Sequence, residues 1–206
     1  MKSYIHLIRH GITEGNLKSW YYGREDLPLS EIGIKTIEDL ATKGGYPKGD
    51  ETAFYTTGLT RTEQTFKLIY GEAQHKQIPL LQEMDFGDFE CKTYEELKDH
   101  PGFIAWVDDS IGDVAFPGGE SKNGFAERIS RGLNELLGYH RLKELSVRHS
   151  GNDAISLLVC HGGVMSQMMQ EMFATEHKNL WDWMPDPGHG YTVYFQDGKP
   201  SGYEKI

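Results

Sequence analysis

Two histidines occupy equivalent places in the sequence, and both could take part in chemistry. His10 and His161 each follow an apolar stretch and each precede a glycine. In an open α/β sheet, ligands bind beyond the carboxyl ends of the strands. A glycine after the histidine lets the backbone approach a bound group, and a following helix can direct its first N–H groups at an anion. We therefore predict that the two imidazoles share one site.

Two arginines indicate that the ligand of this site is an anion. Arg9 directly precedes His10, and Arg61 lies in the first turn of a predicted helix that follows a strand. Burying a dianion is costly, and each charge-assisted hydrogen bond to it contributes roughly 1.5–3 kcal/mol. Guanidinium groups supply such bonds in bidentate pairs. Together with the imidazoles they would form a small cationic basin that fits a phosphate monoester.

A histidine and a carboxylate at this site could cleave such an ester. An imidazole nitrogen can accept the phosphoryl group and release it to water in a second step. The departing alkoxide then needs a proton. Glu83 is the first candidate because it follows a predicted strand, and Asp85 is a weaker alternative.

Strand and helix signals alternate along the chain, which predicts a sheet flanked by helices. The continuous apolar run at 154–160 indicates a buried central strand of a largely parallel sheet. Thr60 with Glu63, and Thr93 with Glu96, have capping-box spacing and predict helix starts. Further strands are expected at 3–8, 53–56 and 78–81, helices at 30–43, 60–70, about 125–145 and about 162–173, and a terminal hairpin at 191–205.

The composition predicts a soluble protein with one domain over residues 1–206. The 206 residues are 38% hydrophobic and 25% charged, which suffices for one sizeable core. The net charge of −10 disfavours binding to nucleic acid or to an anionic membrane, because both would be repelled at long range. The periodicity weakens within residues 84–120, where we expect a partly helical insertion rather than a linker.

The cysteines and the apolar segments favour a cytoplasmic location. Only Cys91 and Cys160 occur, too few for a disulfide-stapled secreted domain of this size. The first ten residues are interrupted by His6 and are unlike a signal peptide. No run of about 18 apolar residues predicts a membrane span. The oligomeric state is not indicated by any pattern in the chain.

Six short segments resemble the histidine phosphatase superfamily, also called the phosphoglycerate mutase-like family. The first is Arg9-His10-Gly11, followed by Thr13 and Asn16. The others lie in the family's order at 23–33, 59–65, 81–87, 117–121 and 159–163. A single tripeptide would be weak evidence, whereas an ordered set that spans most of the chain is highly specific.

The resemblance implies a fold and a role for each matching residue. The expected fold is a three-layer α/β/α sandwich with a largely parallel central sheet, and the expected chemistry uses no metal and no cofactor. His10 is expected to form a phosphohistidine, and Glu83 to act first as proton donor and then as base for water. The expected phosphate contacts are Arg9, Asn16, Arg61, His161 and the backbone N–H of Gly162. The expected substrate rim includes Thr13, Gly23 and Arg24.

Two places depart from the family's pattern without touching the phosphate core. Gly58 stands where many members carry Asp, and Phe89-Glu90-Cys91 replaces the usual Trp-Glu-Gly. These changes bear on the leaving-group contacts and the shape of the rim. An arginine-rich stretch and an Arg-His-Tyr-Gly-Gly-Leu segment, which resemble substrate-binding elements of the mutases, are absent. Hydrolysis by a phosphatase is therefore favoured over mutase activity.

Other interpretations stay open from the sequence. The nearest is a cofactor-dependent phosphoglycerate mutase, and a different class is a non-catalytic phospho-ligand-binding protein. Asn16 could be a turn residue and Glu83 a solvated loop carboxylate. For His189, which precedes a predicted strand, a structural role is favoured over a catalytic one. The substrate could be alpha-ribazole phosphate, a sugar phosphate or a glycerate phosphate, because all carry the same dianion.

Overall fold

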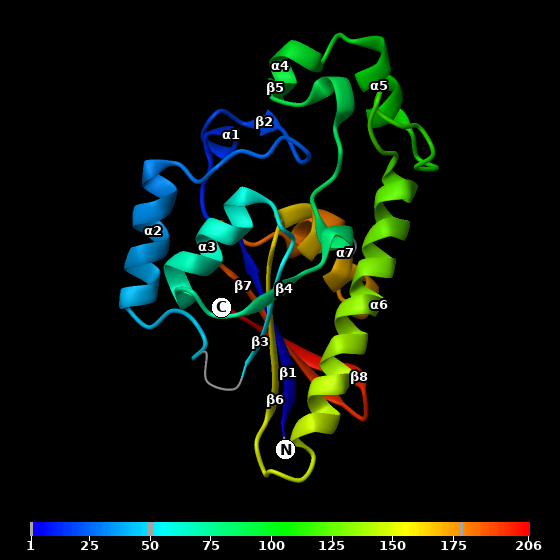
Figure 1. Ribbon diagram of the computed structural model, residues 1–206. Helices are drawn as coiled ribbons and strands as arrows, with labels where there is room; N and C mark the ends of the chain where they lie inside the picture. The colour runs from blue at the N-terminus through cyan, green and yellow to red at the C-terminus, as the bar shows by residue number, and fades with distance from the viewer. Residues whose placement is uncertain (1, 49–51, 178) are drawn as a thin grey trace.

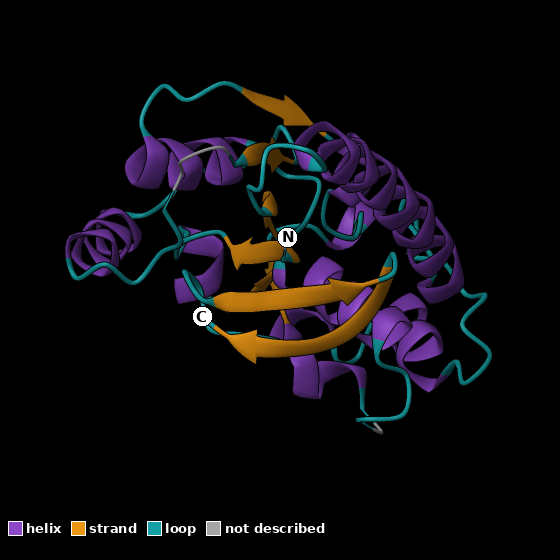
Figure 2. Cartoon of the chain, turned by 90° about the horizontal axis from the view of Figure 1, so that it is seen from below, coloured by secondary structure: helices purple, strands orange, loops and turns teal. Residues whose placement is uncertain are grey.

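A mixed β-sheet forms the centre of the protein. The computed structural model describes residues 2–48, 52–177 and 179–206. Within these residues the main sheet has six strands, four of them parallel and two in an antiparallel hairpin at one edge (Figures 1 and 2). In spatial order they are β4 (His75–Gln77), β3 (Ala53–Thr56), β6 (Ala154–Cys160), β1 (Ser3–Arg9), β7 (Gly190–Gln196) and β8 (Lys199–Lys205).

Helices cover both faces of this sheet, as the side chains of β6 demonstrate. Leu157 and Val159 are buried in a core with Phe66 of α3 (Thr60–Tyr70). Leu158 and Cys160 belong to a larger core on the opposite face, because successive side chains of a strand alternate. That face is covered by α6 (Lys122–Val147) and α7 (Gly162–Met172), whereas α2 (Glu31–Thr42) packs on α3. The predicted layered fold with a mostly parallel sheet is confirmed (Figure 2).

Short elements lie beyond the carboxyl ends of the parallel strands, at the top of Figure 1. The pair β2 (Trp20–Tyr21) and β5 (Lys92–Thr93) forms a small second sheet. The stretch 84–120 contains a 3₁₀ turn and two helices, and these make it partly helical. The remaining short helices are α1 (Glu14–Leu17), α4 (Tyr94–Leu97) and α5 (Pro101–Asp108), with the 3₁₀ turns η1 (Pro79–Leu81), η2 (Gly87–Phe89) and η3 (Leu180–Trp183).

The strand predicted at 78–81 is wrong, because the chain forms β4 at His75–Gln77 and then the 3₁₀ turn η1. Pro79 has no N–H for a sheet ladder and begins the turn. Ile78 and Leu81 are nevertheless fully buried, which explains why their apolar pattern imitates a strand. The edge strand that does form is exposed and polar, so hydrophobicity did not mark it.

One of the two predicted capping boxes is also wrong. The helix α3 begins at Thr60 as predicted, but its N-cap is Leu59, which makes no side-chain cap. The Thr60 backbone N–H and hydroxyl bond to Asp26, and Glu63 accepts a hydrogen bond from Thr56. The box formed by Thr93 and Glu96 is confirmed at the start of α4. Spacing alone does not distinguish the two sites, because a tertiary carboxylate competes for the first.

Candidate active site

A cavity of about 740 Å³ opens beyond the carboxyl ends of β1 and β6. Five side chains that the sequence assigned to the site line it: Arg9, His10, Asn16, Arg61 and Glu83. They come from the end of β1, from α1, from the first turn of α3 and from the loop after η1. Residues far apart in the sequence therefore meet at the predicted edge of the sheet.

His10 presents one free ring nitrogen at this cavity. Its Nδ1 lies 2.7 Å from the carbonyl oxygen of Gly11, which can only accept, so Nδ1 carries the proton. Nε2 then bears a lone pair and has no hydrogen-bond partner among the described residues. Burial, together with the charges of Arg61 and Arg9, holds the pKa of His10 well below its usual value. At neutral pH the ring is therefore neutral, with an unprotonated Nε2 at the cavity.

The ring of His161 lies behind His10 and is fully occupied by protein partners. The two ring centroids are 5.2 Å apart in an edge-to-face arrangement. Arg61 Nε donates to His161 Nδ1 over 3.2 Å, so the remaining proton is on Nε2 and is donated to the Thr57 hydroxyl at 2.9 Å. The residue is completely buried, and burial with the Arg61 charge lowers its pKa well below the usual value. In this structure His161 holds Arg61 rather than facing the cavity.

Arg61 is anchored by three hydrogen bonds yet keeps donors free. Besides His161, its Nη1 donates to the carbonyl of Glu25 at 3.0 Å and its Nη2 to that of Gly23 at 2.7 Å. Its guanidinium carbon lies 5.1 Å from the centre of the Tyr22 ring. Each terminal nitrogen retains one N–H without a partner among the described residues, and such donors suit a phosphate oxygen.

Arg9 has far fewer partners than Arg61. Its Nη1 donates to the carbonyl of Pro185 at 2.6 Å, and its Nε is buried without any partner in the described part of the chain. A Cβ on Gly162 would lie only 3.1 Å from the Arg9 Cζ and Nε atoms, so glycine permits the close approach of α7. Burial lowers the pKa of Arg9, and the nearby Glu83 carboxylate opposes this. A buried guanidinium N–H without a protein acceptor is a donor that an anionic ligand can use.

Glu83 is the carboxylate that the structure brings to the cavity. Its Oε2 accepts the N–H of Gly163 at 2.9 Å, in the first turn of α7, and its Oε1 accepts that of Met84 at 3.1 Å. A Cβ on Gly163 would lie 2.6 Å from Glu83 Oε1, so a larger residue would displace the carboxylate. Asp85, the weaker candidate, instead pairs with Arg24 at 2.9 Å.

Asn16 turns its amide nitrogen toward the cavity because a capping box fixes its oxygen. The Asn16 Oδ1 accepts from the Thr13 N–H and hydroxyl, at 3.0 and 3.1 Å. Nδ2 has no partner among the described residues and remains a donor for a ligand. Thr13 itself is completely buried and bonds to the Tyr22 hydroxyl at 2.6 Å, so it supports the site from below rather than forming its rim.

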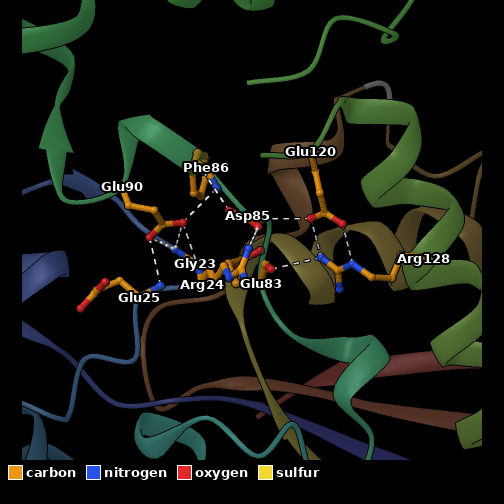
Figure 3. Close-up of polar contacts among 10 residues, drawn as sticks. Gly23, Arg24, Glu25, Glu83, Asp85, Phe86, Glu90, Glu120 and Arg128 are labelled. Atoms are coloured by element: carbon orange, nitrogen blue, oxygen red, sulfur yellow. Dashed lines mark hydrogen bonds and ion pairs between the residues drawn. The ribbon is translucent and has the colours of Figure 1, made fainter. Parts of the chain in front are cut away.

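The loop at 23–25 serves Arg61 and is held by a carboxylate that sequence reasoning did not select. Glu90 accepts backbone N–H groups of this loop and of the segment before η2, as Figure 3 shows: Gly23, Arg24, Glu25 and Phe86. The Gly23 and Glu25 carbonyls that bind Arg61 are fixed in this way. Arg24 points outward, with a side chain 75% exposed, and does not line the cavity.

The remaining lining of the cavity is largely aromatic, and the sequence analysis did not identify most of these residues. The apolar lining includes Trp20, Tyr21, Phe86, Trp106, Phe125 and Trp181. These residues come from separate parts of the chain, so no motif or spacing joins them. The cavity thus combines cationic groups with a broad apolar lining.

His189 has a structural contact outside the cavity. Its Nδ1 donates to the carbonyl of Ile206 at 3.1 Å, and its own carbonyl accepts the backbone N–H of Arg9. Among the described residues, no group of three or more His, Cys, Asp or Glu side chains is arranged to hold a metal ion. In the same part of the chain, no helix is both long enough and apolar enough to cross a membrane.

Comparisons with known proteins identify the family of this chain. The model of the histidine phosphatase superfamily, branch 1, matches residues 5–203. The chain belongs to this superfamily. An adenosylcobalamin/alpha-ribazole phosphatase of Escherichia coli K12 is 28% identical over 187 residues, covering 88% of this chain and 85% of the relative. A 2,3-bisphosphoglycerate-dependent phosphoglycerate mutase of Xanthobacter autotrophicus is 32% identical over 129 residues, covering 56% of this chain and 58% of the relative.

Two solved structures have a similar fold. The alpha-ribazole phosphatase of Shigella flexneri superposes with a TM-score of 0.74 at 26% identity, covering 96% of this chain and 93% of its own. A phosphoglycerate mutase of Bacillus anthracis gives a TM-score of 0.75 at 19% identity and covers 100% and 92% of the two chains. At that lower identity the second likeness concerns the fold alone.

The two departures from the superfamily pattern both lie at positions with a left-handed backbone. Cys91 adopts φ +59°, a conformation that suits the glycine usual at this position in the superfamily. Its N–H donates to the carbonyl of Tyr21 at 2.7 Å. Gly58 adopts φ +84°, and a Cβ there would lie 3.1 Å from the Gln77 side chain. Neither residue lines the cavity, so both changes act on its surroundings.

Proposed function

We propose that this protein is a phosphatase that hydrolyses a small phosphorylated metabolite through a phosphohistidine at His10. The observation that carries the proposal is the free Nε2 lone pair of His10, which faces a cavity that also holds two guanidinium groups and a carboxylate. A nucleophile, cationic ligands for phosphate and a proton donor are the groups that phosphoryl transfer through a covalent intermediate requires. Membership of the superfamily supports the same reaction class.

The phosphate is held, in this proposal, by donors that the fold leaves unused. Arg9 contributes its partnerless Nε and Nη2, and Arg61 contributes one N–H from each terminal nitrogen. Asn16 Nδ2 and the backbone N–H of Gly162 at the start of α7 complete the set. His161 acts by fixing Arg61 from behind and by placing its ring edge against His10.

Two chemical steps then follow. In the first, His10 Nε2 attacks phosphorus, a P–N bond forms, the P–O bond to the leaving group breaks, and the Glu83 carboxyl group gives that oxygen a proton. In the second, the Glu83 carboxylate takes a proton from water as the water oxygen attacks phosphorus, and the P–N bond breaks. Inorganic phosphate leaves, and His10 is neutral again. The Gly163 N–H that binds Glu83 keeps the carboxylate in place for both steps.

The aromatic walls favour a leaving group with a flat apolar part. A phosphate and a sugar alone would leave much of a 740 Å³ cavity with tryptophan and phenylalanine walls unfilled. The alpha-ribazole phosphatase relatives have such a substrate in their names. We therefore place alpha-ribazole phosphate ahead of a sugar phosphate or a glycerate phosphate.

Phosphoglycerate mutase activity is the second candidate, carried by the mutase relatives that cover part of the chain. The substrate of a mutase is small and bears a carboxylate as well as phosphate. The apolar lining of the cavity offers such a molecule few contacts, which favours hydrolysis. A non-catalytic phosphate-binding role would leave the free His10 Nε2 without a purpose.

Further parts of the proposal concern the setting of the enzyme. Arg9 and Arg61 supply the positive charge that phosphate requires, so we propose a reaction without metal ion or cofactor. Both cysteines are free thiols, and one of them, Cys160, is buried, which supports the reducing cytoplasm as the location. The net charge of −10 argues against nucleic acid as a partner. Dialysis against EDTA should leave the activity unchanged.

The test of the proposed function combines turnover with trapping of the intermediate. The purified protein is assayed for phosphate release from alpha-ribazole 5′-phosphate, ribose 5-phosphate and 3-phosphoglycerate, and for mutase activity with a bisphosphate primer. Acid-labile, base-stable phosphate on His10 after a rapid quench is expected, with the highest kcat/KM for alpha-ribazole 5′-phosphate. Mutase turnover faster than hydrolysis would favour the second candidate, and absence of both activities would contradict catalysis.

A further inference from the structure

The segment that carries Glu83 is held from behind by an arginine of α6. Arg128 uses all five of its N–H groups, and every acceptor belongs to the protein. Nη1 donates to the carbonyls of Leu80 and Gln82, both at 2.8 Å, and Nη2 donates to that of Glu83 at 3.1 Å. An arginine without a free donor has nothing to offer a phosphate group. Arg128 is therefore not a ligand of the substrate.

Glu120 is the ionic partner of Arg128 and extends the same support. Its two carboxylate oxygens accept from Arg128 Nε and Nη2, both at 2.6 Å, in a bidentate pair. Glu120 Oε2 also accepts the N–H of Asp85 at 3.0 Å. The pair therefore contacts the backbone on both sides of Glu83, at Gln82 and at Asp85. Figure 3 shows the contacts of Arg128 with Glu83 and of Glu120 with Asp85. Both side chains are only about one-fifth exposed, at 21% and 22%, so water competes weakly for these bonds.

This support matters because residues 82–86 lie outside the helices and strands. The chain leaves η1 at Leu81 and enters η2 only at Gly87, so no sheet ladder fixes Glu83. The close approach of α6 is built in, since a Cβ on Gly132 would lie 2.6 Å from the Leu81 side chain. The carboxylate of Glu83 is held at its tip by Gly163, and its backbone is held by Arg128.

We propose that Arg128, paired with Glu120, is a positioning residue for the proton-transferring carboxylate Glu83. This inference rests on the proposed function, in which Glu83 protonates the leaving group. A displacement of about 1 Å at a reacting group can cost on the order of 10²-fold in rate. Arg128→Lys keeps the charge but cannot reach three carbonyls and a carboxylate at once, so Glu83 should shift.

The test compares two esters of similar size that differ in their need for an acid. Benzyl phosphate releases a strongly basic alkoxide, whereas p-nitrophenyl phosphate releases a stable phenolate that needs little protonation. For Arg128→Lys we expect kcat/KM to fall about 10–100-fold with benzyl phosphate and only a fewfold with p-nitrophenyl phosphate. Steady-state phosphohistidine with p-nitrophenyl phosphate should rise, because Glu83 also activates the water of the second step.

Three further variants separate positioning from general damage to the fold. Arg141→Lys is the matched control, because Arg141 lies on the same helix and pairs with Glu144 at 2.7 Å, and it should not change the ratio of the two esters. Glu120→Gln should shift the ratio in the same direction by a smaller factor, and it serves as the test if Arg128→Lys does not fold. Arg128→Lys added to Glu83→Gln should cause little further loss.

Equal losses with both esters, or a full additional loss in the Glu83→Gln background, would overturn the positioning role. Failure of the proposed function gives a different result. In that case the wild-type protein itself forms no phosphohistidine and hydrolyses neither ester, whatever residue stands at position 128.

Discussion

His10 and His161 share a local sequence pattern but differ in their hydrogen-bond partners. They follow β1 and β6, which are paired in parallel register with Arg9 beside Cys160, and each precedes a glycine. His10 donates its one N–H to its neighbour's carbonyl and leaves Nε2 free, whereas both nitrogens of His161 bond to Arg61 and Thr57. A strand end thus determines where an imidazole lies, and its hydrogen-bond partners determine whether it can attack.

The largest expected effect comes from removing the free imidazole. His10→Ala should lower kcat by about 10⁴–10⁶-fold, as loss of a nucleophile does elsewhere, and should abolish acid-labile phosphate on the protein. Rapid-quench trapping and steady-state kinetics measure both. His189→Ala is the control, because that ring contacts only the carbonyl of Ile206 among the described residues and should leave turnover intact. Parental turnover by His10→Ala would exclude the assigned nucleophile.

Glu83 gives the next largest effect. Glu83→Gln retains hydrogen-bonding capacity toward Gly163 but cannot give a proton to the leaving oxygen. We expect kcat/KM to fall about 10²–10⁴-fold with benzyl phosphate and much less with p-nitrophenyl phosphate. Identical losses with the two esters would show that the carboxylate serves binding or folding instead of acid catalysis.

Substitution of His161 should lower kcat/KM moderately without preventing phosphohistidine formation. His161→Ala removes the acceptor for Arg61 Nε, so one phosphate ligand becomes mobile. We expect kcat/KM to fall about 10–100-fold, while phosphohistidine still forms on His10. If phosphate were trapped on His161, or if His161→Ala abolished trapping, the two histidines would have the wrong roles in our comparison.

The sequence predicted the location of the site better than its walls. Arg9 ends β1 and His10 follows it directly, so their position at one edge of the sheet could be expected from a local apolar pattern. Glu83 lies at the same cavity although the strand predicted before it is the 3₁₀ turn η1. The support given by Arg128 depends on where α6 passes the loop after η1. That placement is set by tertiary packing, and no local sequence pattern predicts it. The aromatic lining depends on four or more separate segments meeting and was largely missed for the same reason.

The same limit explains the error at residues 78–81. A hydrophobic pattern reports burial, and Ile78 and Leu81 are indeed buried, but it does not report which backbone conformation buries them. The roles of His10 and His161 could not be separated at the sequence level either. Both positions have the pattern of an apolar strand, a histidine and a glycine. Thr57, which accepts a hydrogen bond from His161 Nε2, is 104 residues away from His161 in the sequence.

The two imidazoles should behave alike in their protonation. Burial, reinforced by the Arg61 and Arg9 charges, lowers the pKa of His10 and of His161 well below 6.5. Ring ¹⁵N signals, assigned with the Ala variants, should therefore stay those of neutral imidazole between pH 7.5 and 5.5. A midpoint near 6.5 for His10 would mean that its Nε2 is protonated for part of the time and that the site is not a ready nucleophile.

The stability of the protein should follow from the same shifts. Burial also lowers the pKa of His6 and of His140 to about 4. The unfolded chain binds protons at these histidines below about pH 6.5 while the native protein does not, so the free energy of unfolding should fall as the pH drops from 6.5 toward 4. Urea titrations between pH 6.5 and 5.5, above the range of ordinary carboxylates, measure this slope. His140→Gln should make it shallower, because the variant lacks one imidazole that is protonated only in the unfolded chain. An unchanged slope would show that the pKa of His140 is not lowered in the native protein.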